Sequence, residues 1–487
     1  MTTETIAGVS RPVPTDLLIG GKWVAGSGGD RFDVTDPADG TTLCTVADAT
    51  AADATAAIDA AYAVVPELAA MPPRRRAEIL RTAFGVMIER LDDIALLMVR
   101  ENGKALADAK AEATYAAEFF RWYAEEAVRI DGNYTTAPAG TNKILVTRQP
   151  VGVALLITPW NFPAAMATRK WGPAIAAGCP TILKPAAETP LTALLIAEIL
   201  TDAGLPAGAV NVLPSSKAAP ISETALADFR VRKLSFTGST KVGQGLLKLS
   251  ADNVVNTSME LGGNAPFLVF ADADLDAAVD GAMLAKLRNG GEACTAANRF
   301  YVEESIADRF ADKLASAMGS MSMGRGDDDG VKLGPLVNEA TVDKVDRLVK
   351  DAISGGARAL VGGQRPDGAG FFYPATVLVD VPEEADCLTE EIFGPVAPIV
   401  SFSSESEAVR QANDTPYGLV AYLYTGDLGR GLRVSESLEC GMVGINRGVI
   451  SDPAAPFGGM KQSGIGREGA HDGLLEFLET KYVAFTP

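Results

Sequence analysis

The chain has 487 residues, of which 47% are hydrophobic and 22% charged, and its net charge at pH 7 is −19. This length suffices for two or three domains with a large core, and the composition is ordinary for a globular protein. The negative charge argues against nucleic acid or an anionic membrane as a partner, because phosphate groups repel such a surface. The chain has no apolar run of about 18 residues and no signal-peptide pattern, so we expect a cytoplasmic protein without a membrane span.

The five cysteines are scattered, odd in number and free of any C-x-x-C pair. This spacing predicts neither a disulfide framework nor a zinc site, so we expect no bound metal and a reducing compartment. We interpret four of them as small buried hydrophobes, namely Cys44, Cys179, Cys387 and Cys440.

The predicted elements begin with residues 1–20, a polar, proline-containing segment that we expect to be a loosely held arm. Alanine-rich segments with apolar residues at spacings of three and four then predict helices over 51–70 and 74–129. Strands and helices alternate after that. The predicted strands cover 143–148, 151–157, 180–184, 209–213 and 231–236, with helices near 190–203 and 240–250. A second alternating stretch begins near 265 and continues past 440, so the fold class is α/β with doubly wound sheets.

Cys294 lies in a run of small and polar residues, Leu-Arg-Asn-Gly-Gly-Glu-Ala-Cys-Thr-Ala-Ala-Asn-Arg-Phe. Small neighbours leave room for a ligand to reach the sulfur. The chain has a single histidine, His471, so thiol chemistry here would depend on a carboxylate base rather than on imidazole.

Three further segments carry suitable groups. Glu260 stands in Ser-Met-Glu-Leu-Gly-Gly-Asn-Ala-Pro, an apolar setting in which a carboxylate is costly to bury, although an exposed charge at a strand end would look the same. Asn161 follows a buried strand, where α/β sheets bind ligands, and its amide is a suitable donor to an oxyanion. Glu391 and Phe393 precede a Gly-Pro turn.

A nucleotide site is predicted at residues 236–243, where a strand leads into a helix. Gly238 and Ser239 lie at that helix N-terminus, whose free N–H groups favour a pyrophosphate, although a plain N-cap turn would look similar. The single G-x-G-x-x-G, at 464–469, follows no buried strand and has too few residues after it for a βαβ unit, so we interpret it as a mobile loop.

Together these motifs resemble the aldehyde dehydrogenase superfamily over nearly the whole chain, in the family's order: PWNFP, LKPA, FTGS, MELGGN, the Cys294 run, EIFGPV and PFGG-K-SG-GRE. The resemblance implies a Rossmann-type nucleotide-binding domain over 1–130 and 150–262 and an α/β catalytic domain over 263–462. It also implies a small β oligomerisation element with the C-terminal tail over 131–149 and 463–487, and hence a homodimer or homotetramer.

The resemblance also implies roles for individual residues. Cys294 would attack an aldehyde, Asn161 and the Cys294 main-chain N–H would hold the oxyanion, and Glu260 would activate the water that hydrolyses the thioester. The implied cofactor-binding residues are Trp160, Lys184, Ala187, Gly238, Ser239, Glu391 and Phe393. Lys170 and Glu468 are similar to the family's proton-relay pair, with a structural salt bridge as the equal alternative.

The subfamily with the greatest resemblance is that of the succinate-semialdehyde dehydrogenases, in which Arg169, Arg288 and Ser451 would hold the distal carboxylate of the substrate. Arg169 and Lys170 are adjacent on a helix, so we expect them to point in different directions. The alternatives are a dehydrogenase of another aldehyde such as glutarate semialdehyde and, from other classes, a thiol esterase or a non-catalytic nucleotide-binding scaffold.

Three positions depart from the family pattern. Glu292 replaces the usual glutamine two residues before Cys294; it would raise the thiol pKa by like-charge repulsion or point outward and have no effect. Ala296 stands where some relatives carry a second cysteine, so we expect no redox switch. Ala187 stands where relatives that prefer NAD often have glutamate, which favours NADP with NAD as the alternative.

Overall fold

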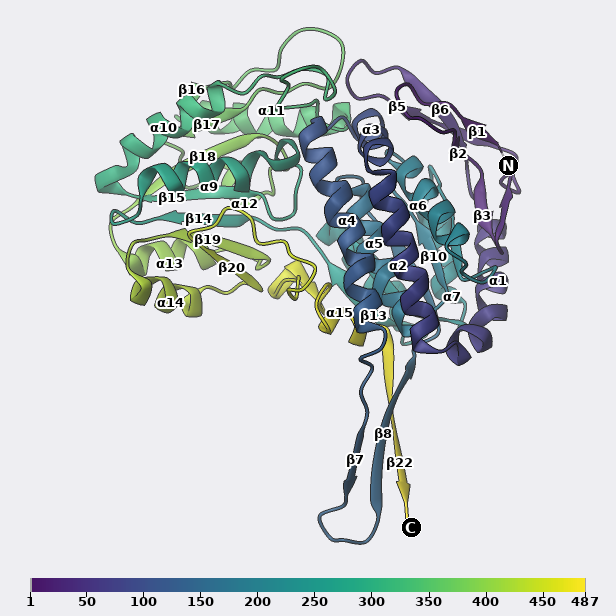
Figure 1. The fold of residues 1–487 in the computed structure, drawn as a ribbon. Helices are drawn as coiled ribbons and strands as arrows, with labels where there is room; N and C mark the ends of the chain where they lie inside the picture. Colours follow the sequence, from purple (N-terminus) through teal and green to yellow (C-terminus); the bar gives the residue numbers. More distant parts are fainter. Residues whose placement is uncertain (1, 487) are drawn as a thin grey trace.

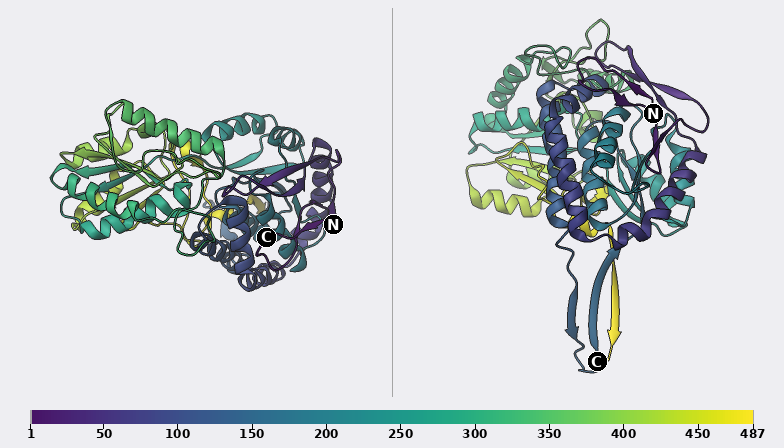
Figure 2. Two further views of the ribbon diagram at one scale, coloured as in Figure 1. Left: turned by 90° about the horizontal axis from the view of Figure 1, so that it is seen from above. Right: turned by 45° about the vertical axis from the view of Figure 1, so that its right-hand side comes forward.

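The computed structural model describes residues 2–486. Two α/β lobes lie side by side, and a narrow three-stranded sheet projects away from them (Figure 1). The first lobe contains the N-terminal half of the chain, and the second contains most of residues 265–460. Viewed from above, the two lobes form the two ends of an elongated body (Figure 2).

The first lobe is built on an eight-stranded sheet with the order β21-β13-β12-β9-β10-β11-β3-β4. The five strands from β13 to β11 are parallel, and the flanking strands are antiparallel to their neighbours. The bounds are β3 Leu17–Ile19, β4 Lys22–Val24, β9 Val153–Ile157, β10 Thr181–Lys184, β11 Val210–Val212, β12 Val231–Thr237, β13 Asn256–Glu260 and β21 Gly464–Ile465. The parallel strands bring the segments that follow β9, β12 and β13 to one edge of the sheet, where ligands bind in this architecture.

Helices cover both faces of this sheet: α1 Ala51–Ala70, α2 Pro73–Glu89, α3 Leu91–Asn102, α4 Leu106–Glu126, α5 Pro163–Ala177, α6 Pro190–Asp202, α7 Ala218–Ala227 and α8 Thr240–Ala251. Among residues 2–486, no single helix is long and apolar enough to cross a membrane. The pair α1 and α2, bent by 116° where they meet, passes that test only together and only by length and composition.

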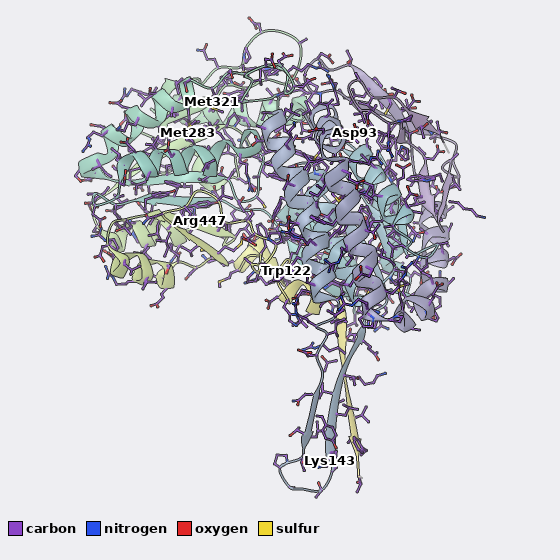
Figure 3. The ribbon with its side chains drawn as sticks, viewed as in Figure 1. Asp93, Trp122, Lys143, Met283, Met321 and Arg447 are labelled. Carbon is purple, nitrogen blue, oxygen red and sulfur yellow. The ribbon has the colours of Figure 1, made fainter. Side chains whose placement is uncertain are left out.

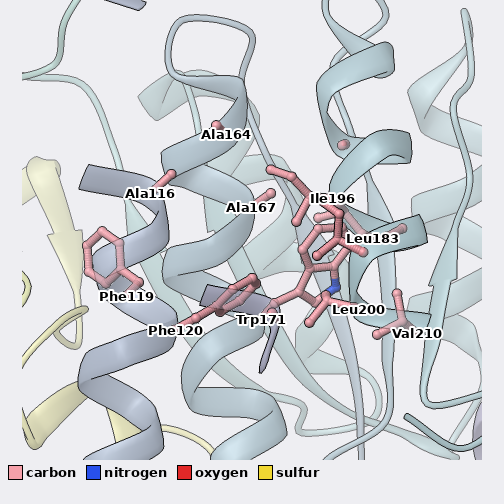
Figure 4. Packing of buried hydrophobic residues seen from close by; sticks show 14 of the residues in the cluster. Ala116, Phe119, Phe120, Ala164, Ala167, Trp171, Leu183, Ile196, Leu200 and Val210 are labelled. Atoms are coloured by element: carbon pink, nitrogen blue, oxygen red, sulfur yellow. The ribbon is translucent and has the colours of Figure 1, made fainter. Parts of the chain in front are cut away.

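Helix α5 is the core helix of the first lobe, and each of its residues is buried. Its Trp171 is fully buried and lies in the cluster of apolar side chains that Figure 4 shows with Phe119, Phe120 and Ile196. Replacing such a tryptophan with alanine costs about 3–5 kcal/mol. This packing holds the polar residues of the same helix in place.

The helical region predicted over 74–129 is present and consists of the three helices α2, α3 and α4. The main break lies at Gly103, which has a φ of 91° and ends α3. A Cβ atom at this position would lie 2.8 Å from Pro335 and 3.1 Å from Pro37, so only glycine fits without a shift. The break directs the next residue, Lys104, into the interior.

The loosely held N-terminal arm is also a wrong prediction. Strands β1 Thr3–Glu4 and β2 Val13–Pro14 pair with each other, and β3 joins the main sheet. Val13, Leu17 and Leu18 are fully buried, because this apolar run covers the end of the sheet. A hairpin of β5 Arg31–Thr35 and β6 Thr42–Ala47 follows.

The second lobe is built on a seven-stranded sheet with the order β16-β17-β18-β15-β14-β19-β20. The strands are β14 Ala265–Val269, β15 Ala297–Glu303, β16 Arg358–Val361, β17 Thr376–Val379, β18 Val396–Phe402, β19 Val420–Tyr424 and β20 Met442–Ile445. The helices are α9 Leu275–Leu287, α10 Ala307–Gly319, α11 Glu339–Ser354, α12 Asp386–Thr389, α13 Glu405–Asn413 and α14 Leu428–Ser437, with 3-10 turns at Arg288–Gly291, Glu304–Ile306 and Lys461–Ser463. The α/β order predicted past residue 265 is therefore present.

The projecting sheet joins two distant segments, β7 Asn133–Thr136 and β8 Lys143–Pro150 with the C-terminal strand β22 Leu478–Phe485. The β8–β22 register runs from Pro150 opposite Leu478 to Lys143 opposite Phe485. Figure 3 labels Lys143 near the far end of this sheet. Strands β7 and β22 each have one edge that pairs with no other strand among residues 2–486.

The G-x-G-x-x-G segment is not the mobile loop that we predicted. Gly464 and Ile465 form β21 and pair with Glu260 and Met259 of β13. A short helix, α15 Asp472–Leu475, follows. Gly464 allows β21 to pack closely against β13, since a Cβ atom at this position would lie 2.1 Å from the Met259 carbonyl oxygen. This segment carries Glu468 to the end of the first-lobe sheet.

Candidate active site

A cavity of about 770 Å³ lies where the carboxyl ends of the first-lobe strands face the second lobe. Its lining combines the turn after β9, the turn after β12, the end of β13, the Cys294 segment, α11 and the segment 391–393. Of the predicted site residues, it brings together Trp160, Asn161, Gly238, Ser239, Glu260, Cys294, Glu391 and Phe393.

Cys294 follows a tight turn in which three successive residues, Asn289, Gly290 and Gly291, have φ values of 54°, 63° and 81°. The turn packs closely against the segment at Gly394, because a Cβ atom at Gly291 would lie 2.3 Å from the Gly394 carbonyl oxygen. Burial raises the pKa of the Cys294 thiol, the Glu260 carboxylate raises it further, and Arg169 lowers it. The thiol therefore needs a base or a cation to become a thiolate at neutral pH.

Asn161 is held by its main chain and its side chain. Its carbonyl oxygen accepts hydrogen bonds from Lys104 Nζ at 2.7 Å and Asn289 Nδ2 at 2.8 Å. Its own Nδ2 donates to the Glu292 carbonyl oxygen at 2.9 Å. An amide nitrogen carries two hydrogens, so one remains for a ligand in the cavity beside Cys294.

Glu260 ends β13 as a buried carboxyl group, and neither of its oxygens has a hydrogen-bond partner among the described residues. Burial raises its pKa, and Arg169 opposes this shift. The Arg169 Nη2 atom lies 3.7 Å from Glu260 Oε2. A buried acid with free oxygens and a raised pKa suits general-base work on a water molecule.

Arg169 and Lys170 contact the same carboxylate, contrary to our expectation that they point in different directions. Arg169 Nε lies 2.5 Å from Glu468 Oε2, and Lys170 Nζ lies 2.5 Å from Glu468 Oε1. Lys170 also donates to Ser235 Oγ at 3.0 Å. Burial works against the charge on Glu468, but the two cations hold its pKa below the usual value. Glu468 is thus an ionised link between two neighbouring basic residues.

A second, smaller cavity of about 220 Å³ is lined by Arg288 and Ser451 together with Thr295 and Tyr422. Arg288 Nη2 lies 3.5 Å from Thr295 Oγ1, and its guanidinium group lies over the Phe162 ring. Thr295 follows Cys294 directly, so this cavity adjoins the nucleophile segment. Arg169 is not among the residues that line it.

The predicted cofactor residues fit a nucleotide in part. Ser239 is the N-cap of α8, and Glu391 Oε1 accepts the Gly263 N–H at 3.2 Å. The Trp160 and Phe393 rings meet edge to face at 5.3 Å and form an apolar wall beside Cys294. Ser239 with the α8 N-terminus matches the phosphates of a nucleotide, and Glu391 matches a ribose. The Trp160 and Phe393 rings match a flat ring.

Lys184 and Ala187 do not line the Cys294 cavity. Ala187 borders a separate cavity of about 710 Å³ with Glu188 and Ser216, and Lys184 is buried near Glu188. The cavity instead contains two residues of α11 that the sequence analysis missed, Thr341 and Lys344. No motif marks them, because they reach the site only through the position of their helix.

Glu292 points away from the thiol. Its carboxyl group is buried, and Oε1 accepts the Val337 N–H at 3.0 Å. Burial raises its pKa to about 8. The sequence left open like-charge repulsion of Cys294 or a side chain that points outward without effect. The geometry supports neither, because the carboxyl group turns away from the thiol but is buried and accepts the Val337 N–H.

Known proteins of one family are similar to this chain over most of its length. A family model described as "Aldehyde dehydrogenase family" matches residues 23–483. The chain is 56% identical over 441 residues to the succinate-semialdehyde dehydrogenase of Paenarthrobacter nicotinovorans, which covers 91% of this chain and 98% of that protein. It is 49% identical to the NADP(+) succinate-semialdehyde dehydrogenase GabD of Escherichia coli (strain K12), over 96% of both chains. A crystal structure of succinate-semialdehyde dehydrogenase from Burkholderia pseudomallei has a TM-score of 0.96 and 48% identity, covering 98% of this chain and 99% of that one. The chain belongs to the aldehyde dehydrogenase family.

Proposed function

We propose that this enzyme oxidises succinate semialdehyde to succinate, with NADP as the electron acceptor. The observation that carries the reaction is the shared cavity of Cys294, Asn161 and Glu260, in which both Glu260 oxygens are free of hydrogen bonds. The similarity to succinate-semialdehyde dehydrogenases supports the substrate.

The reaction begins when Cys294 Sγ adds to the aldehyde carbon. The free N–H of the Asn161 amide and the Cys294 main-chain N–H stabilise the resulting oxyanion. A nicotinamide held beside Cys294 by Trp160 and Phe393 would supply the hydride acceptor, and loss of a hydride from this carbon would leave a thioester on Cys294. Glu260 then removes a proton from water as the water attacks the thioester, and the acid and the free thiol are released.

Lys170 and Glu468 would act as a relay pair that carries away the proton received by Glu260. Their ion contact at 2.5 Å supports this role. For the cofactor, Glu391 and Lys344 would hold a ribose, the α8 N-terminus a phosphate, and Trp160 with Phe393 the nicotinamide. NADP is preferred in the proposal because the similar GabD of Escherichia coli is named as NADP(+)-dependent.

For the substrate, the cavity that contains Arg288 and Ser451 would receive the distal carboxylate. Arg169, which contacts Glu468 and Glu260, would contribute a second cation. We further propose a cytoplasmic homo-oligomer, a dimer or a tetramer, that uses the projecting sheet. Its unpaired edges and its exposed Tyr134 and Tyr482 support this assembly.

The test is a steady-state panel of succinate semialdehyde, glutarate semialdehyde and hexanal with NADP and NAD, followed at 340 nm. We expect the highest kcat/KM for succinate semialdehyde with NADP. A higher value for glutarate semialdehyde would transfer the proposal to that substrate, and ester hydrolysis without nucleotide reduction would support an esterase instead.

The carboxylate site is tested separately with Arg288→Ala. We expect the KM for succinate semialdehyde to rise by about tenfold to a hundredfold, as for a lost charged hydrogen bond, with hexanal oxidation unchanged. Arg309→Ala is the matched control, because Arg309 is an exposed arginine of α10. An equal loss with both aldehydes would contradict a role in carboxylate binding.

A further inference from the structure

Glu292 connects the nucleophile segment to the start of α11. Its Oε1 accepts the Val337 N–H, and Val337 precedes Asn338, the N-cap of α11. Two residues in the first turns of this helix, Thr341 and Lys344, line the same cavity as Cys294. A single buried side chain therefore joins the nucleophile segment to the helix that faces the proposed cofactor site.

The main chain of Glu292 holds the other side of the cavity. Its carbonyl oxygen accepts from Asn161 Nδ2 at 2.9 Å and from Asn289 Nδ2 at 3.1 Å. Asn289 Nδ2 also donates to the Asn161 carbonyl oxygen at 2.8 Å. Displacing Glu292 would thus displace the amide that faces the oxyanion.

The Glu292 carboxyl group acts here as a hydrogen-bond acceptor and not as half of an ion pair. The cation that influences it, Lys104, already forms a buried ion pair with Glu112 and donates to the Asn161 carbonyl oxygen. The other oxygen of Glu112 accepts the Ala164 N–H at 3.0 Å. Since Lys104 is compensated in this way, an uncharged acceptor of the same shape should replace the Glu292 carboxyl group.

We infer that Glu292 is a positioning residue that sets the Asn161 amide and Cys294 relative to α11, so that oxyanion stabilisation and cofactor binding depend on the same contact. This inference rests on the proposed function, since it assigns Asn161 to the oxyanion and α11 to the cofactor.

The test compares Glu292→Gln, Glu292→Asp and Glu292→Ala, with rates expressed per Cys294 site titrated with iodoacetamide. Glu292→Gln keeps the acceptor oxygen, so kcat and the KM for NADP should remain close to those of the parent enzyme. Glu292→Ala should lower kcat by about tenfold to a hundredfold, as expected for a small displacement of reacting groups, and should raise the KM for NADP several-fold. Glu292→Asp shortens the side chain, so its kcat and its KM for NADP should lie between those of Glu292→Gln and Glu292→Ala. If Glu292→Ala does not fold, Glu292→Asp takes its place in the comparison.

Glu303→Ala is the control, because Glu303 Oε2 accepts the Ala271 N–H at 2.8 Å but lies outside the residues that line the Cys294 cavity. It should leave kcat and the KM for NADP unchanged. An unchanged kcat and KM in Glu292→Ala would overturn the inference, and so would an equal loss in Glu292→Gln, which would make the charge rather than the acceptor essential. Failure of the proposed function is a different result, namely a parent enzyme that reduces NADP with none of the aldehydes.

Discussion

Arg169 and Glu260 face each other across the buried end of β13, with 3.7 Å between Nη2 and Oε2. The same guanidinium group also contacts Glu468. The proposed general base is therefore held next to a cation that the resemblance assigned only to the substrate. Arg169 opposes the effect of burial on the Glu260 pKa, and this gives it an influence on catalysis with any aldehyde.

Arg169→Gln should shift the pH profile of the reaction to higher pH even with hexanal, which has no carboxylate. Burial raises the pKa of Glu260, and loss of the nearby cation raises it further, so the ionised base becomes available only at higher pH. The measurement is kcat against pH, with Arg309→Gln as the control. A profile that stays in place with hexanal, while the KM for succinate semialdehyde rises, would restrict Arg169 to substrate binding.

Glu260→Gln should block hydrolysis of the thioester and leave its formation intact. The first turnover should still produce nucleotide absorbance at 340 nm, and the steady state should fall by about 10²–10⁴-fold, the usual contribution of a general base. Stopped-flow measurement separates the two phases. Loss of the first turnover together with the steady state would mean that Glu260 is also required to deprotonate Cys294.

Asn161→Ala should lower kcat by about 10²–10³-fold, as when one oxyanion donor is removed. The KM should change little, because the donor acts mainly on the developing charge. The amide also donates to the Glu292 carbonyl oxygen, so thermal unfolding must be measured alongside. A fall in stability without a fall in kcat would assign Asn161 to structure alone.

Glu292→Gln should stabilise the enzyme, and the gain should increase with pH. Burial raises the folded-state pKa of Glu292 to about 8, above its value in the unfolded chain. The folded chain therefore retains a proton on Glu292 that the unfolded chain releases. The contribution of Glu292 to the free energy of unfolding is fully present below its unfolded pKa and is lost as the pH rises through about 8. Urea denaturation of both proteins at pH 5, 7 and 9 tests this expectation, and a gain independent of pH would contradict it.

The sequence by itself determined the fold class, because alternation of apolar strands and helices needs no tertiary information. Local patterns also pointed to Cys294, Glu260 and Asn161 as candidates, and the structure brings these three residues to one cavity. The sequence predicted the ends of individual helices and strands less accurately. The break at Gly103 depends on Pro335 and Pro37, which lie far away in the chain. The N-terminal arm is ordered because β1 pairs with β2 and β3 pairs with β11.

Only the tertiary structure decided how charges pair around the site. Glu468 lies 298 residues from Lys170, and it compensates both Lys170 and Arg169 because β21 places the chain at the end of β13. The direction of Glu292 was equally hidden, because its acceptor oxygen is fixed by a main-chain N–H 45 residues away. Local sequence specifies which groups are present. Long-range packing specifies which of them are desolvated together, and desolvation decides their protonation and their chemistry.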